Sequence, residues 1–362
     1  MQLSCKIVII TSKPGATMFS TYEEAKKFID TYPIHLVDLK FIDLWGRWHH
    51  VTLSAHEFDA DTLLSGVGFD GSSVGLKSVK SGDMALIPDL STGFVDPFSE
   101  IACLSFICST VEADTKKPFS RDPRQIARRA EQTIASTQVA DASMWGPEFE
   151  FYVFTHVSFE NTPNACGYHL DAAEAVWNNP KGGEGNYIPV HGGYHAIPPK
   201  DKLFGLRSEI VVALENAGVP VKYHHHEVGA AGQCEIETPL LGLVKAADAT
   251  MMIKYFVKMI ASRNGFTASF LPKPIFGEAG SGLHFHQQLL LRGQNAFYDE
   301  HSSNLLSTNA LYYIGGLLKH APAVLAFTNP STNSYRRLVP GYEAPVNCFF
   351  STGNRSAAVR IP

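Results

Sequence analysis

The chain has 362 residues, of which 45% are hydrophobic and 18% charged, and its formal net charge is −5. This composition describes a globular protein and excludes the strongly basic surface that nucleic-acid binding requires. Six cysteines are scattered without a Cys-x-x-Cys pair, which favours a reducing compartment, and the apolar run at 6–10 is too short to span a bilayer. We therefore expect a cytoplasmic protein of two domains, with no membrane or nucleic-acid partner.

The first 110 residues predict a small domain that mixes strands with one helix. Residues 1–18 are expected to form an extra N-terminal segment, because Ser-Lys-Pro-Gly at 12–15 separates the apolar run from the first expected helix. The role of this segment is open. Asp70 and Ser73 lie in a glycine-rich loop, a pattern that is also common in simple turns. A capped helix is expected at 21–29, and strands are expected at 36–43, 48–53, 84–88 and 101–108.

Strands and helices interleave in the rest of the chain, which predicts an α/β second domain. Residues 155–198 are rich in Gly, Asn and Pro and predict a long irregular segment, of the kind that is usually functional or mobile. Helices are expected at 123–138, 202–217, 240–263 and 308–327, and strands at 146–154, 219–228, 267–271 and 283–291.

The strand at 146–154 alternates polar and aromatic residues. Glu148 and Glu150 share one face, whereas Phe149 and Phe151 share the other, which predicts an apolar face in the core and two carboxylates side by side opposite it. Two anions about 7 Å apart along a strand repel each other unless a positive group lies beside them. A divalent cation is the natural candidate. The alternative is a half-exposed strand with a solvated acidic face.

Other segments supply further groups that bind cations. Glu227 ends a run of three histidines, and a Gly/Ala turn would bring Glu235 back beside it. His284 and His286 are spaced to project from one face of another strand. Sets dominated by oxygen suit Mg²⁺ or Mn²⁺ better than zinc.

The C-terminal part combines arginines with proline- and glycine-rich loops. Arg337, Arg355 and Arg360 are of the type that clamps phosphates during phosphoryl transfer. No Walker or Rossmann glycine pattern occurs in the sequence. Any nucleotide would therefore be held through cations and arginines.

Eight short motifs occur in order: Phe-Asp-Gly-Ser-Ser at 69–73, Gly-Pro-Glu-Phe-Glu-Phe at 146–151, His-Gly-Gly-Tyr at 191–194, His-His-His-Glu-Val at 224–228, Ala-Gly-Gln-Cys-Glu at 231–235, Lys-Pro-Ile-Phe-Gly at 273–277, Gly-Ser-Gly-Leu-His at 280–284, and 337–345. Through them the chain from about residue 19 to its end resembles a type I glutamine synthetase. The resemblance implies an α+β fold, with a β-grasp domain at 19–112 and an α/β-barrel-like catalytic domain at 113–362. It also implies two stacked hexameric rings, in which neighbouring subunits share each active site.

The resemblance further implies a glutamate–ammonia ligase. Such an enzyme uses ATP to convert glutamate to γ-glutamyl phosphate, which ammonia then attacks to give glutamine. Its substrates would be glutamate, ammonium and ATP, with two or three Mg²⁺ or Mn²⁺ ions in each site. By resemblance, the cation at glutamate is bound by Glu150, Glu227 and Glu235, and the cation at ATP by Glu148 and His284.

The same resemblance assigns the other site residues. Asp70 would take the proton of ammonium, and Ser73 and Tyr194 would complete the ammonium pocket, with Asp70 and Ser73 lent by a neighbouring subunit. Glutamate would contact Gly280 and Arg337. The remaining roles are phosphoryl transfer for Arg355, shielding of the intermediate by the flap residue Glu343, and nucleotide binding by His286 and Arg360.

Several positions depart from the family pattern. Ala279 stands where an asparagine usually contacts substrate, Leu240 where an aromatic side chain packs on adenine, and Lys222 where an acidic residue contacts ribose. The chain stops before an Arg-x-Glu-Phe-Arg stretch that supplies a third ligand to the ATP cation, so we expect a C-terminally truncated chain of low activity. Two alternatives are open: a γ-glutamyl ligase acting on an organic amine, and a catalytically silent paralogue acting as an interaction or regulatory subunit.

Overall fold

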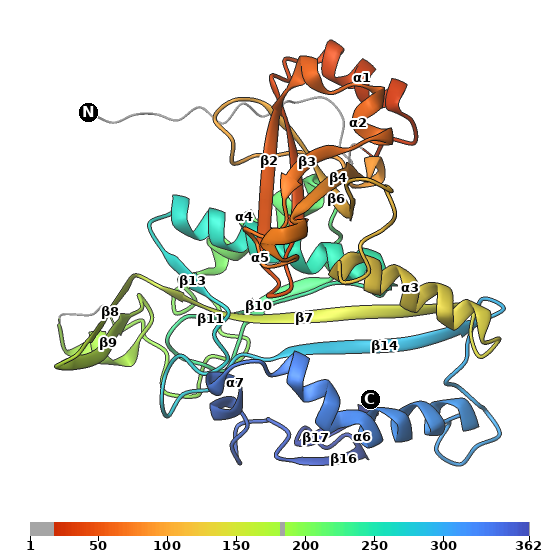
Figure 1. The fold of residues 1–362 in the computed structure, drawn as a ribbon. Helices are drawn as coiled ribbons and strands as arrows, with labels where there is room; N and C mark the ends of the chain where they lie inside the picture. The colour runs from red at the N-terminus through yellow and green to blue at the C-terminus, as the bar shows by residue number, and fades with distance from the viewer. Residues whose placement is uncertain (1–17, 182–184, 362) are drawn as a thin grey trace.

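The computed structural model describes residues 18–181 and 185–361, so the apolar run at 6–10 lies outside the described residues. An N-terminal sheet stands on two long helices, which in turn cover one side of a second, central sheet (Figure 1). The C-terminal segments lie on the other side of the central sheet (Figure 1). This layering leaves one sheet face in a core and the other toward the C-terminal part of the chain.

The N-terminal sheet has the strand order β2-β1-β6-β4-β3, with β5 paired to β6. The helix α1 (Tyr22–Thr31) begins where the Thr21 side chain accepts a hydrogen bond from the Glu24 backbone, and a capping box at Asp59 starts α2 (Ala60–Leu64). Leu39, Leu104 and Phe106 are fully buried in its core. The strands are β1 (Leu36–Ile42), β2 (Trp48–Ser54), β3 (Val67–Asp70), β4 (Asp83–Pro88), β5 (Phe94–Val95) and β6 (Cys103–Glu112).

The central sheet is built around β7 (Ala142–Phe154), the strand that alternates polar and aromatic residues. It has the order β10-β11-β7-β14-β15, with β12 and β13 also paired to β7, and all of these pairs are antiparallel. The strand expected at 283–291 is confirmed with the same bounds. The partners are β10 (Tyr223–His226), β11 (Gln233–Glu237), β12 (Leu241–Gly242), β13 (Thr267–Ser269), β14 (Leu283–Leu291) and β15 (Gln294–Asn295).

Three helices follow the expected positions closely: α3 (Pro123–Ser136), α4 (Phe204–Asn216) and α5 (Leu243–Arg263). The aromatic face of β7 packs in one core with α4 and α5, as the alternation predicts, and Phe151 there is fully buried. Phe94 and Phe98 of the N-terminal part belong to the same core. The two parts of the chain are therefore joined by shared apolar burial.

The C-terminal segments comprise α6 (Thr308–Thr328), α7 (Thr332–Arg337) and the parallel strands β16 (Asn347–Thr352) and β17 (Ala357–Ile361). Among the described helices, α6 is the one whose length and apolar composition would allow it to cross a membrane. Its residues Leu318, Lys319 and Leu325 instead line the cavity described below. α6 therefore forms part of the wall of that cavity.

The irregular segment expected at 155–198 is partly wrong. It contains a hairpin of β8 (His156–Thr162) and β9 (Ala165–Asp171), which projects from the end of β7 (Figure 1). All residues of β8 are exposed, although Val157 and Phe159 alternate with polar residues. The expectation followed the Gly, Asn and Pro content of the whole segment and overlooked this short alternation. Short 3₁₀ helices lie at Ala55–Glu57, Val79–Ser81, Leu90–Thr92 and Val176–Lys181.

Candidate active site

The polar face of the central sheet carries carboxylates from adjacent strands in direct register. Glu150 of β7 pairs with Glu235 of β11, and Glu148 pairs with Glu237 of β11 on one side and with His284 of β14 on the other. Because side chains alternate along a strand, residues two apart in each strand share this face. The sheet thus collects anionic side chains from three strands on one surface.

One cluster on this surface contains Glu227, Glu235 and His225, whose ligand atoms all lie within 4.8 Å of one another. His225 Nε2 is 3.5 Å from Glu235 Oε1, and His225 Nδ1 is 3.9 Å from Glu227 Oε2. Burial, together with the charges of Glu150 and Glu235, raises the pKa of Glu227 to about 8. Burial likewise raises the pKa of Glu150. The expected trio Glu150, Glu227 and Glu235 therefore shares one electrostatic environment.

A second set surrounds Glu148. Its Oε2 lies 2.9 Å from His284 Nδ1, and its Oε1 lies 2.5 Å from His286 Nε2. Burial alone would favour protonation, but the two histidines hold the pKa of Glu148 well below its usual range. The expected pair Glu148 and His284 is in contact, and His286 contacts the other carboxylate oxygen of Glu148.

Buried hydrogen bonds fix the strands that carry these groups. The fully buried His226 lies 2.9 Å from Glu174 through Nε2, which anchors β10 beside Glu227. Gln233 donates from Nε2 to Glu150 Oε2 at 3.2 Å and to the Gly280 carbonyl at 3.1 Å. Such partners hold a carboxylate in one orientation before a ligand arrives.

A glycine loop brings an arginine against the acidic face. A Cβ atom on Gly280 would lie 2.0 Å from Arg337 Cδ and 2.6 Å from the Pro272 carbonyl oxygen, so only glycine fits there. Arg337 is buried and donates from Nη1 to the Tyr342 carbonyl at 2.9 Å, while its Nε has no hydrogen-bond partner among the described residues. This arrangement leaves a donor available for an anionic ligand.

These groups surround one cavity of about 1290 Å³ between the sheet and the C-terminal segments. Asp70 and Ser73 are not among its lining residues; they lie in the N-terminal part, where Ser73 Oγ donates to Asp70 at 2.5 Å. Hydrogen bonds from Ser73 and Ser72 lower the pKa of the exposed Asp70. The expected site residues that do line the cavity are Glu148, Glu150, Tyr194, Glu227, Glu235, Gly280, His284, His286, Arg337, Glu343, Arg355 and Arg360.

Two side chains of the acidic face lie outside the set expected from the sequence. Glu237 follows Glu235 by two residues and therefore points to the same side of β11, a spacing that could have revealed it. His225 is the middle of three consecutive histidines, and only the register of β10 against β11 shows which of them faces Glu235.

The donor set fits divalent cations. It consists of carboxylate oxygens with a minority of imidazole nitrogens, and Glu227 Oε2 is buried without a hydrogen-bond partner in the described chain. A buried carboxylate oxygen without a partner is costly unless a cation neutralises it. Arg337, Arg355 and Arg360 line the same cavity from the C-terminal segments, and their guanidinium groups are suited to binding a phosphate. The cavity is thus equipped for cation-assisted phosphoryl transfer.

Comparison with known proteins agrees with this chemistry. The family models for the glutamine synthetase β-grasp domain and catalytic domain match residues 33–113 and 120–362. A glutamine synthetase of Streptomyces coelicolor is 48% identical over 95% of this chain and 74% of that protein, and one of Escherichia coli K12 is 43% identical over 94% and 73%. The cryo-EM structure of Plasmodium falciparum glutamine synthetase superposes with a TM-score of 0.87 at 26% identity, covering 96% of this chain and 68% of that one. On this combination of site, sequence and fold, the chain belongs to the glutamine synthetase family.

Proposed function

We propose that this chain condenses glutamate with ammonium at the expense of ATP, through γ-glutamyl phosphate. The observation that carries the proposal is the single cavity with carboxylates and imidazoles on the sheet and arginines on the facing wall. A carboxylate is a poor electrophile, so it must be phosphorylated before an amine can displace its oxygen. The family is one of carbon–nitrogen ligases that bind ATP and divalent metal.

The residues divide this task between them. Arg337 lies against Gly280, where its free Nε can meet the substrate carboxylate. Arg355 and Arg360 line the same cavity, and we assign stabilisation of the transferring phosphoryl group to Arg355 and nucleotide binding to Arg360. Glu150, Glu227 and Glu235 would hold one divalent cation, and Glu148 and His284 another. When bound, these cations, Mg²⁺ or Mn²⁺, neutralise phosphate and carboxylate charge.

Release of the intermediate to water would waste it, so the cavity needs a cover. Glu343 lines the cavity from the loop before β16 and has a φ of +54°, a backbone conformation that non-glycine residues seldom adopt. We assign this loop as the flap. Its strained residue is of the kind found where loops change conformation on ligand binding.

Ammonium binding is assigned to Asp70, Ser73 and Tyr194. Asp70 has a lowered pKa and is therefore a stable anion that can hold a cation. We also assign to it the acceptance of the ammonium proton. Because Asp70 is exposed and lies outside the cavity of its own chain, we propose that it completes the cavity of a neighbouring subunit. We further propose two stacked hexameric rings, a cytoplasmic location, and domains at 19–112 and 113–362.

The choice of amine tests the proposal. Purified protein is assayed with ATP, glutamate and either ammonium or methylamine, in Mg²⁺ and in Mn²⁺, with glutamine or the methylamide identified by mass spectrometry. We expect kcat/KM for ammonium to exceed that for methylamine. A higher kcat/KM for methylamine would favour the organic-amine ligase, and no ATP-dependent amide from either amine would favour a catalytically silent subunit.

A further inference from the structure

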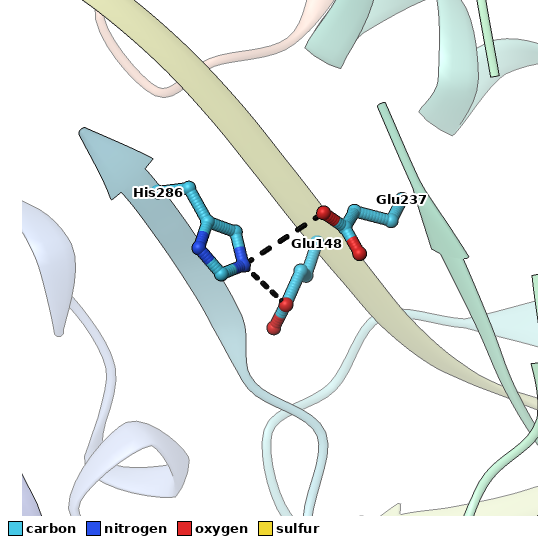
Figure 2. Close-up of side chains that lie close together, drawn as sticks. All are labelled: Glu148, Glu237 and His286. Carbon is cyan, nitrogen blue, oxygen red and sulfur yellow. Dashed lines mark hydrogen bonds and ion pairs between the residues drawn. The ribbon is translucent and has the colours of Figure 1, made fainter. Parts of the chain in front are cut away.

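A second group of ligand-type atoms lies beside the expected cation sites. It consists of Glu148, Glu237 and His286, whose nearest ligand atoms all lie within 4.8 Å of one another. Figure 2 shows the three side chains converging from β7, β11 and β14. His286 Nε2 is 2.5 Å from Glu148 Oε1 and 3.8 Å from Glu237 Oε1. A small rearrangement would place one cation in contact with all three.

Glu148 keeps this group separate from the pair it forms with His284. Its Oε2 faces His284 and its Oε1 faces His286, so the carboxylate offers one oxygen to each side. The cluster of His225, Glu227 and Glu235 shares no residue with the new group. Glu237 is therefore not a spare ligand of a cation already assigned.

The state of Glu237 is an independent sign that it awaits a ligand. Its side chain is 2% exposed, and its Oε2 has no hydrogen-bond partner among the described residues. Its Oε1 accepts a hydrogen bond from Lys222 Nζ at 2.7 Å, and the Lys222 side chain is 51% exposed. A buried carboxylate oxygen without a partner is unfavourable, because it has lost its hydration without compensation.

Phosphate cannot be that partner. Glu148 and His286 line the cavity where ATP phosphates are proposed to bind, Glu237 lies beside them, and the two carboxylates would repel phosphate. A cation between the carboxylates and the phosphates removes this conflict and satisfies Glu237 Oε2 at the same time. Two carboxylates and one imidazole favour Mn²⁺ over Mg²⁺, because imidazole nitrogen suits transition metals better than Mg²⁺.

We propose that Glu237 is a ligand of a divalent cation held together with Glu148 and His286, at a position distinct from that of Glu150, Glu227 and Glu235. The inference concerns metal binding by the protein alone. It therefore stands or falls independently of which amine the enzyme uses.

The first test is a titration of the metal-free full chain with MnCl₂. Binding is measured by calorimetry and by the loss of the electron paramagnetic resonance signal of free Mn²⁺. In Glu237→Gln and in His286→Gln, we expect the same class of Mn²⁺ sites to weaken about tenfold or more, with little further loss in the double variant. Glu227→Gln should weaken a different class. Glu215→Gln, on the exposed side of α4, is the matched control and should leave the isotherm unchanged.

The second test uses the unaltered protein, so it does not depend on the folding of any variant. Anomalous diffraction from crystals soaked in MnCl₂ should show a Mn²⁺ peak about 2.0–2.6 Å from Glu237 Oε2, the range of hard-cation bonds to oxygen. A Mn²⁺ isotherm unchanged by Glu237→Gln would overturn the proposal. So would Mn²⁺ peaks confined to the other carboxylates, with Glu237 bound by Lys222 alone.

Discussion

Individual carboxylates in this cavity differ sharply in proton affinity although they lie on neighbouring strands. Glu148 is held ionised by His284 and His286, whereas burial and nearby carboxylates raise the pKa of Glu227 to about 8. The difference arises from the neighbours of each group: two imidazoles in one case, two like charges in the other. Glu148 is thus ready to bind a cation at neutral pH, while Glu227 must first lose a proton.

Cation binding at Glu227 should therefore depend on pH. A carboxyl with a raised pKa is neutral below that pKa, so the affinity of this site for Mn²⁺ should rise as pH increases from 6 towards 8 and level off above it. His225 acts in the same direction: burial lowers its pKa, but Glu235 and Glu227 outweigh burial and raise it. At pH 7 we expect release of about one proton per cation.

Calorimetry in two buffers of different ionisation enthalpy measures this proton release. Glu227→Gln should remove most of it, because the titrating carboxyl is gone. An affinity for Mn²⁺ that stays flat between pH 6 and 8.5 would contradict the assigned protonation state of Glu227.

At the level of elements, the loop between β13 and β14 depends on one close approach. Gly280→Ala would press its new methyl group into Arg337 and the Pro272 carbonyl, displacing the arginine that we assign to glutamate. Displacement of a positioning group by about 1 Å can cost about 10²-fold, and we expect a loss of that size in kcat/KM for glutamate. The control is Gly315→Ala in α6, where a Cβ meets nothing within 4 Å. A Gly280→Ala enzyme with the kcat/KM of the parent would show that this contact is dispensable.

Two helices and a loop are tied together by a single buried arginine. Arg124 of α3 donates from Nε and Nη2 to Asp248 of α5 at 2.9 and 2.8 Å, and from Nη2 to Asp89 of the N-terminal part at 2.8 Å. Arg124→Met would leave the largely buried carboxylate of Asp248 without its hydrogen-bonded cation, whereas Asp89 keeps Arg128. This change should lower the free energy of unfolding by about 3–5 kcal/mol. Urea unfolding at one fixed protein concentration measures it.

The matched control is Arg129→Met, an exposed position on the same helix, which should change the free energy of unfolding by at most about 0.5 kcal/mol. If Arg124→Met is no more destabilising than Arg129→Met, the arginine does not hold these elements together.

Sequence patterns predicted the long elements that pack in the core and missed a short, largely exposed hairpin. The alternation in β7 revealed both its buried face with Phe149 and its polar face with Glu148. The hairpin β8–β9 also alternates, with Val157 and Phe159 in β8, but the alternation is short and lies in a segment rich in Gly, Asn and Pro. His225 and Glu237 join the candidate site through strand register, and register depends on long-range pairing that a short motif does not contain.

At the scale of the whole molecule, the N-terminal part is anchored rigidly to the catalytic part. Lys40 of β1 is buried between Asp38 and Asp96, and Tyr255 of α5 donates to Asp96 at 3.0 Å. Trp48 and Phe98 pack on the same tyrosine. Because both parts share this interface, Asp70 stays outside the cavity of its own chain, which is the arrangement that the proposed sharing of the site between subunits needs.

Hybrid oligomers test the shared site. Asp70→Asn and Glu227→Gln subunits, each nearly inactive alone, are co-expressed with two different tags and purified through both. Random assembly should restore up to about a quarter of the parent activity, because a mixed interface can join an intact Asp70 to an intact Glu227. Hybrids no more active than either variant would mean that both residues act within one chain.

The central claim is that the glutamate carboxylate itself attacks ATP. The most direct measurement follows ¹⁸O from the side-chain carboxylate of labelled glutamate, in the presence of ATP, ammonium and Mg²⁺, by mass spectrometry of the released phosphate. The account predicts one ¹⁸O atom in the phosphate for each glutamine formed, because the carboxylate oxygen that attacks the γ-phosphorus stays bonded to phosphorus when phosphate leaves. The measurement reads where the label ends up and does not depend on the rate. Glutamine formed with unlabelled phosphate would contradict the acyl phosphate pathway.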